Sequence, residues 1–116
     1  MVTVTRKQSS AVFRAIADPT RREILRLLRD GRLTVGEIAA NFPTSRPSIS
    51  KHLRLLRTAG LVVSHKEGTT RICDLNAKPL HAVHAWLRDY EVLWDESLRN
   101  LKSYVEETQQ QGRKRL

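Results

Sequence analysis

Two stretches of helical periodicity, separated by a break of four residues, are the central feature of this chain. The first covers Val35–Phe42, the break is Pro43–Arg46, and the second covers Pro47–Thr58. In the second stretch, apolar residues recur every three or four positions, as expected for a helix with one buried face: Ile49, Leu53 and Leu56. Two short helices joined by a tight turn predict a helix-turn-helix, whose second helix enters the DNA major groove.

Residues that favour helix ends bound the second stretch. Ser45 is expected to cap its N-terminus, Pro47 suits the first turn, and Gly60 is expected to end it. The face opposite the apolar one is rich in hydroxyl and basic side chains, which contact bases and phosphates in protein–DNA complexes. The alternative is a merely solvated amphipathic face, as most such faces are. The turn, the caps and the net charge favour DNA binding.

The predicted DNA contacts of this region follow from its polar residues. They are Thr44, Ser45, Arg46, Ser48, Ser50, Lys51 and Arg54. Among them, Arg46, Ser50 and Lys51 are expected to contact bases, because Arg and Lys donate to guanine edges and a small hydroxyl allows close approach. Ser45, Ser48 and Arg54 are expected to bind phosphates.

Two further helices are predicted before the helix-turn-helix. The first covers Gln8–Ala17, and the second begins after a capping Asp18 and ends before Gly31. The basic side chains of the second helix are expected mostly in solvent, with phosphate contact as the alternative: Arg21, Arg22, Arg26 and Arg29. A short strand is expected at Leu33–Val35, where Thr34 caps the third helix.

After Gly60 the hydrophobic pattern changes to a period of two. Leu61–Lys66 and Thr70–Leu75 are predicted strands, and Glu67–Thr69 between them is a predicted hairpin turn. A basic hairpin directly after a recognition helix is typical of a wing, although an ordinary surface turn is the alternative. The wing residues expected to contact the DNA backbone or minor groove are Lys66, Thr69, Thr70 and Arg71.

The longest predicted helix opens at Lys78-Pro79 after a capping Asn76 and runs to about Glu107. Its apolar residues alternate three and four positions apart over more than three heptads, and at 1.5 Å per residue it spans roughly 45 Å. That is more than a small domain needs, so homodimerisation is expected, with a cofactor site as the alternative. The predicted dimerisation residues are Val83, Leu87, Tyr90, Trp94, Leu98 and Leu101.

The composition of the chain limits the classes of function that it can have. With 116 residues the chain is expected to form one domain over residues 1–108, followed by a disordered basic tail at 109–116. No apolar run approaches 18 residues and the start, MVTVTRKQSS, lacks a signal segment, so a cytoplasmic protein without membrane contact is expected. The net charge of +9 favours a polyanionic partner. A single cysteine excludes an internal disulfide.

Three blocks follow one another along the chain: Ala17–Arg22 leading into the second helix, Ser45–Leu53, and Leu56–Val62. In this order they resemble the ArsR family of bacterial transcription regulators. The similarity runs from about Ala11 to Glu107, nearly the whole chain. It implies a mainly α fold with a small β-hairpin wing, a winged helix-turn-helix that dimerises through its N- and C-terminal helices. It also implies a homodimeric repressor that binds double-stranded DNA.

Many members of this family respond to metals, but the ligands for that role are missing here. The family's thiolate site lies on the helix before the turn, and Val35–Phe42 contains no cysteine. On the long helix only His81 and His84 are present, at least one ligand short of a usual zinc site unless a dimer mate supplies more. We therefore expect no metal and no cofactor, and the chain is most similar to the metal-independent branch with the SdpR-type autorepressors.

Other functions remain as alternatives. They are a metal-responsive repressor of the same family, a sequence-tolerant architectural DNA-binding protein, a protein-interaction module, and a thiol sensor at Cys73. No catalytic motif is present: there is no glycine-rich phosphate loop, no GxSxG, and no pair of acids flanked by a catalytic histidine. We expect a DNA-binding regulator and not an enzyme.

Overall fold

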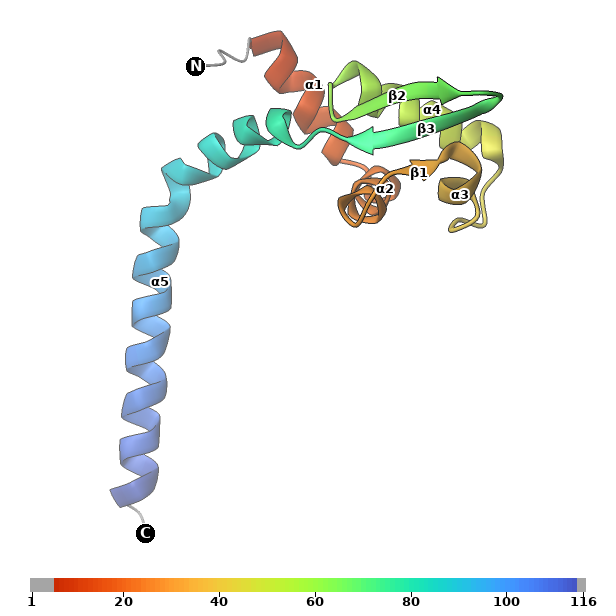
Figure 1. Cartoon of the computed structure of the whole chain (residues 1–116). Helices are drawn as coiled ribbons and strands as arrows, with labels where there is room; N and C mark the ends of the chain where they lie inside the picture. The colour runs from red at the N-terminus through yellow and green to blue at the C-terminus, as the bar shows by residue number, and fades with distance from the viewer. Residues whose placement is uncertain (1–5, 115–116) are drawn as a thin grey trace. The chain divides into compact units, whose positions relative to one another are not determined.

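The computed structural model describes residues 6–114 and divides the chain into two units, Met1–Val83 and His84–Leu116. The first unit contains every helix and strand up to the first turn of the last helix, and the second contains the rest of that helix (Figure 1). The sequence predicts a single domain over residues 1–108. The division arises because, among the described residues, none beyond Val83 packs against the hydrophobic core.

Helices α1 (Arg6–Ile16) and α2 (Pro19–Arg29) meet at a sharp corner. Asp18 caps α2 as predicted, because its carboxylate accepts hydrogen bonds from the backbone N–H groups of Thr20 at 2.8 Å and Arg21 at 3.1 Å. Helix α1 begins two residues earlier than expected, since its first residues have good helix propensity and no residue there ends the helix.

Two arginines at the start of α2 bind backbone carbonyl groups at the end of α1. Arg21 Nε donates to the carbonyl of Ala15 at 2.7 Å, and its Nη2 donates to that of Arg14 at 3.0 Å. Arg22 Nη1 donates to the carbonyl of Ile16 at 2.9 Å. The last carbonyls of a helix have no partner within it. These guanidinium groups therefore cap α1, a role that the sequence analysis did not foresee.

The helix-turn-helix consists of α3 (Val35–Ala39) and α4 (Arg46–Thr58), preceded by the two-residue strand β1 (Leu33–Thr34). Thr34 caps α3 in a reciprocal box with Glu37: Thr34 Oγ1 accepts from Glu37 N at 3.1 Å, and Glu37 Oε1 accepts from Thr34 N at 3.0 Å. Helix α3 ends three residues earlier than predicted, and a hydrogen-bonded turn replaces its last turn.

Both predicted caps of α4 are confirmed. Ser45 Oγ accepts from the backbone N–H of Ser48 at 3.3 Å, which satisfies a donor in the first turn. At the other end Gly60 has a φ of 78°, and the N–H of Leu61 donates to the carbonyl of Leu56 at 2.9 Å. This is a Schellman motif, whose left-handed residue favours glycine.

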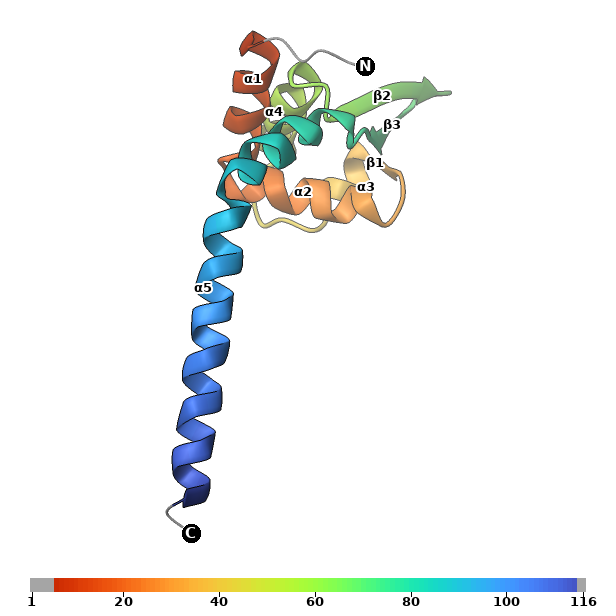
Figure 2. The ribbon, with the colours of Figure 1, turned by 90° about the vertical axis from the view of Figure 1, so that its left-hand side faces the viewer.

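The strands form one antiparallel sheet in the order β1-β3-β2 (Figure 1). Strands β2 (Val62–Glu67) and β3 (Thr70–Leu75) pair as the predicted hairpin, and β1 pairs with the far edge of β3. Gly68 opens the two-residue loop with a φ of 64°, as a tight hairpin requires. Turned by 90°, the hairpin tip extends beyond the helices of this unit (Figure 2).

The hydrophobic core joins the helices to one face of this sheet. Its buried members come from α1, α2, α3, α4, the connection after α4 and the two hairpin strands: Val12, Ala15, Ile24, Leu28, Ile38, Ile49, Leu53, Leu56, Ala59, Leu61, Val62 and Cys73. The predicted inward positions of α4 are therefore correct. Because α4 and the hairpin share this core, the recognition helix and the wing are held as one body.

Asn76 is not the N-cap residue of the long helix as predicted, although its Oδ1 accepts a hydrogen bond from the backbone N–H of Lys78 at 3.4 Å, at the start of the 3₁₀ turn before that helix. Its side-chain amide donates to the carbonyl of Gly60 at 2.9 Å, and its backbone N–H donates to the carbonyl of Leu61 at 2.8 Å. Asn76 thus joins the end of β3 to the end of α4, and the 3₁₀ turn Lys78–Leu80 intervenes before the helix.

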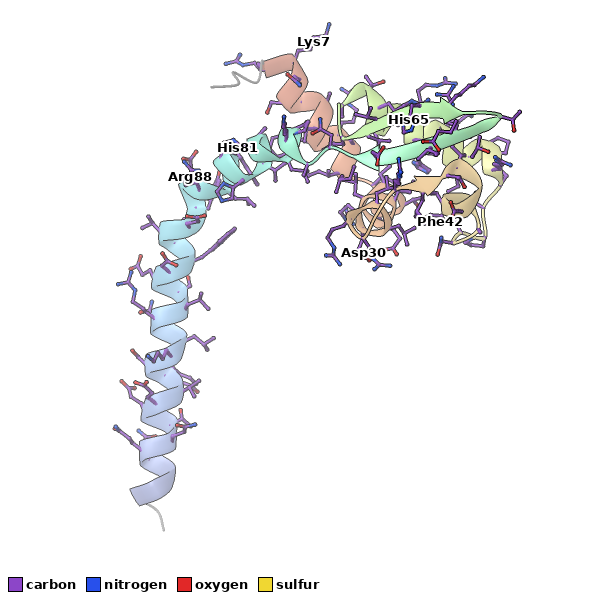
Figure 3. All side chains as sticks on the ribbon, viewed as in Figure 1. Lys7, Asp30, Phe42, His65, His81 and Arg88 are labelled. Carbon is purple, nitrogen blue, oxygen red and sulfur yellow. The ribbon has the colours of Figure 1, made fainter. Side chains whose placement is uncertain are left out.

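Helix α5 (His81–Lys114) is longer than predicted. It includes residues 109–114, which the sequence analysis assigned to a disordered tail, while Arg115 and Leu116 lie outside the described residues. Gln, Arg and Lys are good helix formers, and the single Gly112 costs only about 1 kcal/mol relative to alanine. Side chains project from α5 along its length (Figure 3).

Candidate nucleic-acid interface

Helix α4 presents one face to the core and the other to solvent. Ile49, Leu53 and Leu56 are at most 1% exposed. The polar positions predicted to contact DNA are exposed, except that Ser48 is half-buried: Thr44, Ser45, Arg46, Ser50, Lys51 and Arg54. An amphipathic helix anchored in this way offers a fixed row of donors and hydroxyls to a ligand.

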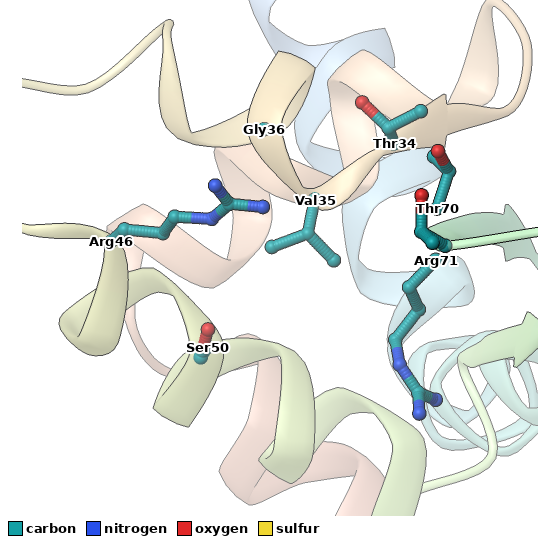
Figure 4. Close-up of a pocket in the computed structure, with 8 residues that line it drawn as sticks. Thr34, Val35, Gly36, Arg46, Ser50, Thr70 and Arg71 are labelled. Carbon is teal, nitrogen blue, oxygen red and sulfur yellow. The ribbon is translucent and has the colours of Figure 1, made fainter. Parts of the chain in front are cut away.

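A hollow of about 370 Å³ lies between the recognition helix and the wing (Figure 4). Its lining comes from the start of α3, the start of α4 and the hairpin: Thr34, Val35, Gly36, Arg46, Ser50, Thr69, Thr70 and Arg71. Five of these residues are among the predicted DNA contacts. The structure therefore brings together side chains that lie more than 20 residues apart in the sequence.

Arg46 reaches from the first turn of α4 toward α3 (Figure 4). A methyl group built on Gly36 would lie 3.8 Å from Arg46 Nη2, an ordinary van der Waals distance. The guanidinium thus lies at the wall of the hollow, beside the N-terminal turn of α3. From this position its donors face the ligand-accessible space between the two helices and the wing.

Arg71 lies on the opposite side of the hollow, on the wing (Figure 4). Its Nη1 donates to Ser64 Oγ at 3.1 Å, across the hairpin from β3 to β2. The pleat places Arg71 on the same sheet face as Cys73, and its pairing partner Lys66 lies on that face too. The face that forms the core at one end of the hairpin is therefore basic at the other.

On the other face of the wing, acidic side chains lie close to basic ones and offset their charge. His65 Nε2 lies 3.3 Å from Glu67 Oε1, and its Nδ1 lies 3.8 Å from Asp74 Oδ2. Arg32 Nη1 lies 3.8 Å from the same Glu67 oxygen. His65 is labelled on this sheet in Figure 3. The positive charge of the wing is thus directed toward the α4 side.

The sequence analysis did not include the start of α3 in the site. Thr34, Val35 and Gly36 line the hollow together with the predicted contacts. The spacing of Thr34 and Glu37 is a capping box that was visible in the sequence, and it locates this helix start. The hydrogen bonds from Thr34 to the Glu37 carboxylate also lower the pKa of that carboxyl group.

A polar cluster fixes α4 against the first two helices. His52 Nδ1 lies 3.2 Å from Arg21 Nη1 and 4.0 Å from Asp18 Oδ1. His52 is half-buried among these contacts, so it has a structural role. Partial burial disfavours ionisation of Asp18. The hydrogen bonds from Arg21 and Thr20, with the charges of His52 and Arg21, nevertheless lower the pKa of its carboxyl group below 3.8.

The net charge of the protein resides entirely in the first unit. Residues 1–83 contain 15 of the 21 Lys and Arg and six of the 12 Asp and Glu. They account for the whole formal charge of +9, and residues 84–116 are neutral overall. A polyanion would therefore be attracted to the unit that carries α4 and the wing.

The candidate sensor groups differ in their surroundings. Cys73 is fully buried, and burial raises the pKa of its thiol above 9.0, although Arg57 and Arg71 partly oppose this. A buried thiol of raised pKa is a poor nucleophile, which argues against a thiol sensor. His81 and His84 are exposed, and within residues 6–114 no three potential metal ligands converge.

The predicted dimerisation residues divide into two groups. Val83 packs against the core of the first unit, and Leu87 is half-buried. The other four are exposed in the single chain: Tyr90, Trp94, Leu98 and Leu101. Five more large apolar residues of α5 are exposed: Trp86, Val92, Leu93, Tyr104 and Val105. The rings of Trp86 and Tyr90 pack with centroids 5.2 Å apart.

No helix in the described part of the chain is long and apolar enough to cross a membrane. The long helix α5 carries exposed apolar side chains, and its sequence also contains many charged residues.

Comparison with known proteins places α2, the helix-turn-helix and the start of β2 in one family. Residues 18–64 match the model for the bacterial regulatory proteins of the arsR family. The transcriptional repressor SdpR of Bacillus subtilis is 43% identical over 79 residues, which are 68% of this chain and 88% of that protein.

Two solved structures extend this likeness to the fold. A crystal structure of an ArsR family transcriptional regulator has a TM-score of 0.71 at 39% identity, over 82% of this chain and 97% of that one. The solution structure of a homodimeric winged helix-turn-helix domain from Mycobacterium bovis has a TM-score of 0.60 at 29% identity, covering 81% and 84%.

Proposed function

This chain belongs to the arsR family of bacterial regulatory proteins, and from that premise we propose that it is a homodimeric, sequence-specific DNA-binding repressor. It acts by binding an operator of approximate two-fold symmetry and blocking polymerase from the promoter. Its own promoter is one candidate target. Binding an operator requires no catalytic step, so we propose no enzymatic activity. Because its target is the bacterial chromosome, the repressor acts in the cytoplasm.

The observation that carries this proposal is the hollow between α4 and the wing, lined by Arg46, Ser50 and Arg71. A DNA duplex presents base edges in the major groove and phosphates along its rim. With α4 in the major groove, Ser50 and Lys51 face base edges, and Arg71 and Lys66 face the backbone beside the groove. The compensated outer face of the wing points away from this surface.

Dimerisation supplies the affinity that one recognition helix lacks. The M. bovis relative is described as homodimeric, and the exposed apolar residues of α5 give this chain a surface for a second copy. Two copies related by a two-fold axis present two α4 helices to successive major grooves. Half-sites then lie about 10 bp apart, centre to centre, or a small multiple of it.

Footprinting on the DNA upstream of the protein's own gene tests the proposal. A protected, approximately palindromic site is expected. Affinity for that site at physiological salt is expected to exceed affinity for random DNA of equal length by about 10³-fold or more. Equal affinity for both DNAs identifies an architectural DNA-binding protein instead. Failure to bind any DNA at low salt contradicts the proposal altogether.

A further inference from the structure

Arg57 lies on the side of α4 that faces the wing. At about 100° per residue, Arg46, Ser50 and Arg57 fall within a sector of about 40° around the helix axis. Arg46 and Ser50 line the hollow across from Arg71 of the hairpin, so this side of α4 faces the hairpin (Figure 4). Arg57 continues the row toward the end of α4. It is half-buried and is not among the DNA contacts predicted from the sequence.

The surroundings of Cys73 place Arg57 near Arg71. Burial raises the pKa of the Cys73 thiol, and the positive charges of Arg57 and, less strongly, of Arg71 lower it. Cys73 pairs with Ser64 across the hairpin, and Ser64 Oγ accepts a hydrogen bond from Arg71 Nη1 at 3.1 Å. The two guanidinium groups therefore belong to the same region, where the end of α4 packs against the hairpin.

Arg57 has no partner within the fold, unlike the arginines of α2. Arg21 and Arg22 donate to carbonyl groups at the end of α1, and Arg26 and Arg29 form ion pairs with acids nearby in the sequence. The side chain of Arg57 forms no hydrogen bond or ion pair with any of residues 6–114. A partly desolvated cation without a counter-charge is costly, and a bound anion removes that cost.

The hairpin adds basic groups to the same region. Lys66 and Arg71 are cross-strand partners on the hairpin face that continues into the core. The acids Glu67 and Asp74 lie on the other face, where His65 is close to both. Positive charge therefore gathers where α4 meets the hairpin, and the acids of the hairpin are directed away from it.

The geometry of DNA determines which anion meets this region. A recognition helix lies in the major groove, and a wing beside it reaches the backbone or the neighbouring minor groove. One sugar–phosphate strand separates these two grooves. With α4 in the major groove, that strand passes over the boundary between α4 and the hairpin. Its phosphates therefore face the basic side chains that lie along this boundary.

We propose that Arg57 binds a phosphate of the DNA strand that passes between α4 and the wing, beside the phosphate bound by Arg71. The inference rests on the DNA binding of the proposed function and adds a residue to its contact surface. A phosphate contact carries no sequence information of its own and fixes the position of the protein on the duplex. Arg57 thus positions the end of α4, while the start of α4 contacts the bases.

A purely structural role is the alternative for Arg57. It lies in the last turn of α4, where a cation interacts favourably with the C-terminal end of the helix dipole. That role predicts a lower melting temperature when Arg57 is replaced and no change in the salt dependence of DNA binding. The phosphate contact predicts the reverse.

Binding to a random-sequence duplex over a salt titration tests the contact. Arg57→Gln is expected to reduce the slope of log affinity against log salt by about one unit, because one phosphate contact is lost. Affinity at low salt is expected to fall about tenfold. Arg26→Gln is the matched control, because it removes the same charge from an exposed position that is paired with an acid. Its salt slope is expected to equal that of wild type.

Two further variants separate charge from structure. Arg57→Lys keeps the charge and is expected to restore the salt slope, with affinity between those of wild type and Arg57→Gln. Arg57→Gln combined with Arg71→Gln is expected to reduce the slope by about two units, since each side chain binds its own phosphate. The melting temperature of Arg57→Gln is expected to match that of wild type.

Inorganic phosphate tests a free anion as the ligand instead of the DNA strand. At constant ionic strength, millimolar phosphate is expected to leave the affinity of wild type and of Arg57→Gln for DNA unchanged. A loss of DNA binding in phosphate that occurs in wild type and is absent in Arg57→Gln would identify a site for a small phosphorylated ligand. That result would overturn the backbone contact.

The outcomes separate this contact from the proposed function. An unchanged salt slope in Arg57→Gln overturns the contact, and a lower melting temperature together with it assigns Arg57 to the structure of α4. Equal affinity of wild type for operator and random DNA refutes the sequence-specific repressor and leaves the contact standing, because the titration uses random DNA. Absence of any DNA binding by wild type at low salt overturns both.

Discussion

The guanidinium of Arg21 lies 3.2 Å from Nδ1 of His52 and joins the start of α2 to the middle of the recognition helix. The same guanidinium donates to the carbonyls of Arg14 and Ala15 at the end of α1. One side chain therefore sets the positions of three helices. His52 accepts this hydrogen bond only while Nδ1 is unprotonated.

Removing Arg21 is expected to reduce stability and to disturb α4. Arg21→Ala leaves two helix carbonyls and His52 without this donor and is expected to cost about 1–3 kcal/mol in the free energy of unfolding. Arg29→Ala is the matched control, because Arg29 is exposed on the same helix, and it is expected to cost under about 0.5 kcal/mol. Urea unfolding followed by circular dichroism measures both. Equal costs would show that Arg21 is not a structural link.

Arg46 and Arg71 are expected to act differently on DNA. Arg46→Ala is expected to relax sequence preference and to cost about 1–3 kcal/mol on the operator, because its donors contact bases. Arg71→Ala is expected to weaken all DNA similarly and to reduce the salt slope by about one unit, because it contacts a phosphate. Binding to operator and random DNA over a salt titration separates the two roles. Identical behaviour of the two variants would contradict this assignment.

Asp18 is expected to make stability depend on acid pH. Its carboxyl pKa is lower in the folded protein than the ordinary 3.8, because the fold favours the charged form. The resulting stabilisation is complete above pH 3.8 and is lost as the pH falls through the folded pKa. Asp18→Asn keeps a cap but cannot titrate.

The measurement is the free energy of unfolding of wild type and Asp18→Asn from pH 7 to pH 2.5. The difference in the free energy of unfolding between the two proteins is expected to be constant at neutral pH and to shrink below pH 3.8. The other acidic groups titrate in both proteins, so their contributions cancel in this difference. A difference that does not change with pH would show that the carboxylate charge does not stabilise the fold.

Metal ions are expected to leave DNA binding unchanged. His81 and His84 are the only two histidines on α5, and two imidazoles do not complete a usual zinc site. Operator affinity with zinc, nickel, cadmium or arsenite is therefore expected to match affinity with chelator, and His81→Ala and His84→Ala are expected to bind normally. A shift beyond about tenfold, or 1.4 kcal/mol, that either variant abolishes would establish metal regulation.

The apolar face of α5 is expected to be essential for the dimer. Trp94→Glu or Leu98→Glu buries an unpaired charge from each copy and is expected to give a folded, largely monomeric protein. Operator affinity is expected to fall by orders of magnitude. Val92→Glu is the matched control, because Val92 is 70% exposed on the opposite face of the helix. Sedimentation with circular dichroism distinguishes a monomer from an unfolded chain. Dimeric variants with normal binding would show that this face serves another purpose.

The sequence by itself determined the helix caps and the buried face of α4, because these depend on interactions between residues close together in the chain. The caps at Asp18, Ser45 and Gly60 were predictable, since each depends on hydrogen bonds within a few residues. The spacing of Ile49, Leu53 and Leu56 likewise identifies the buried face of α4, because helical periodicity is a property of a short segment. The resemblance to a family rests on these same local blocks.

Tertiary structure decided what depends on residues far apart in the chain. The roles of Arg21 and Asn76 come from partners that no periodicity predicts. The hollow joins Thr34 to Arg71 because β1 pairs with β3, and Val83 contacts the core because the first turn of α5 packs against it. Hydrogen bonds and packing between distant segments form only when the core brings those segments together. The sequence pattern of a single segment therefore cannot predict them.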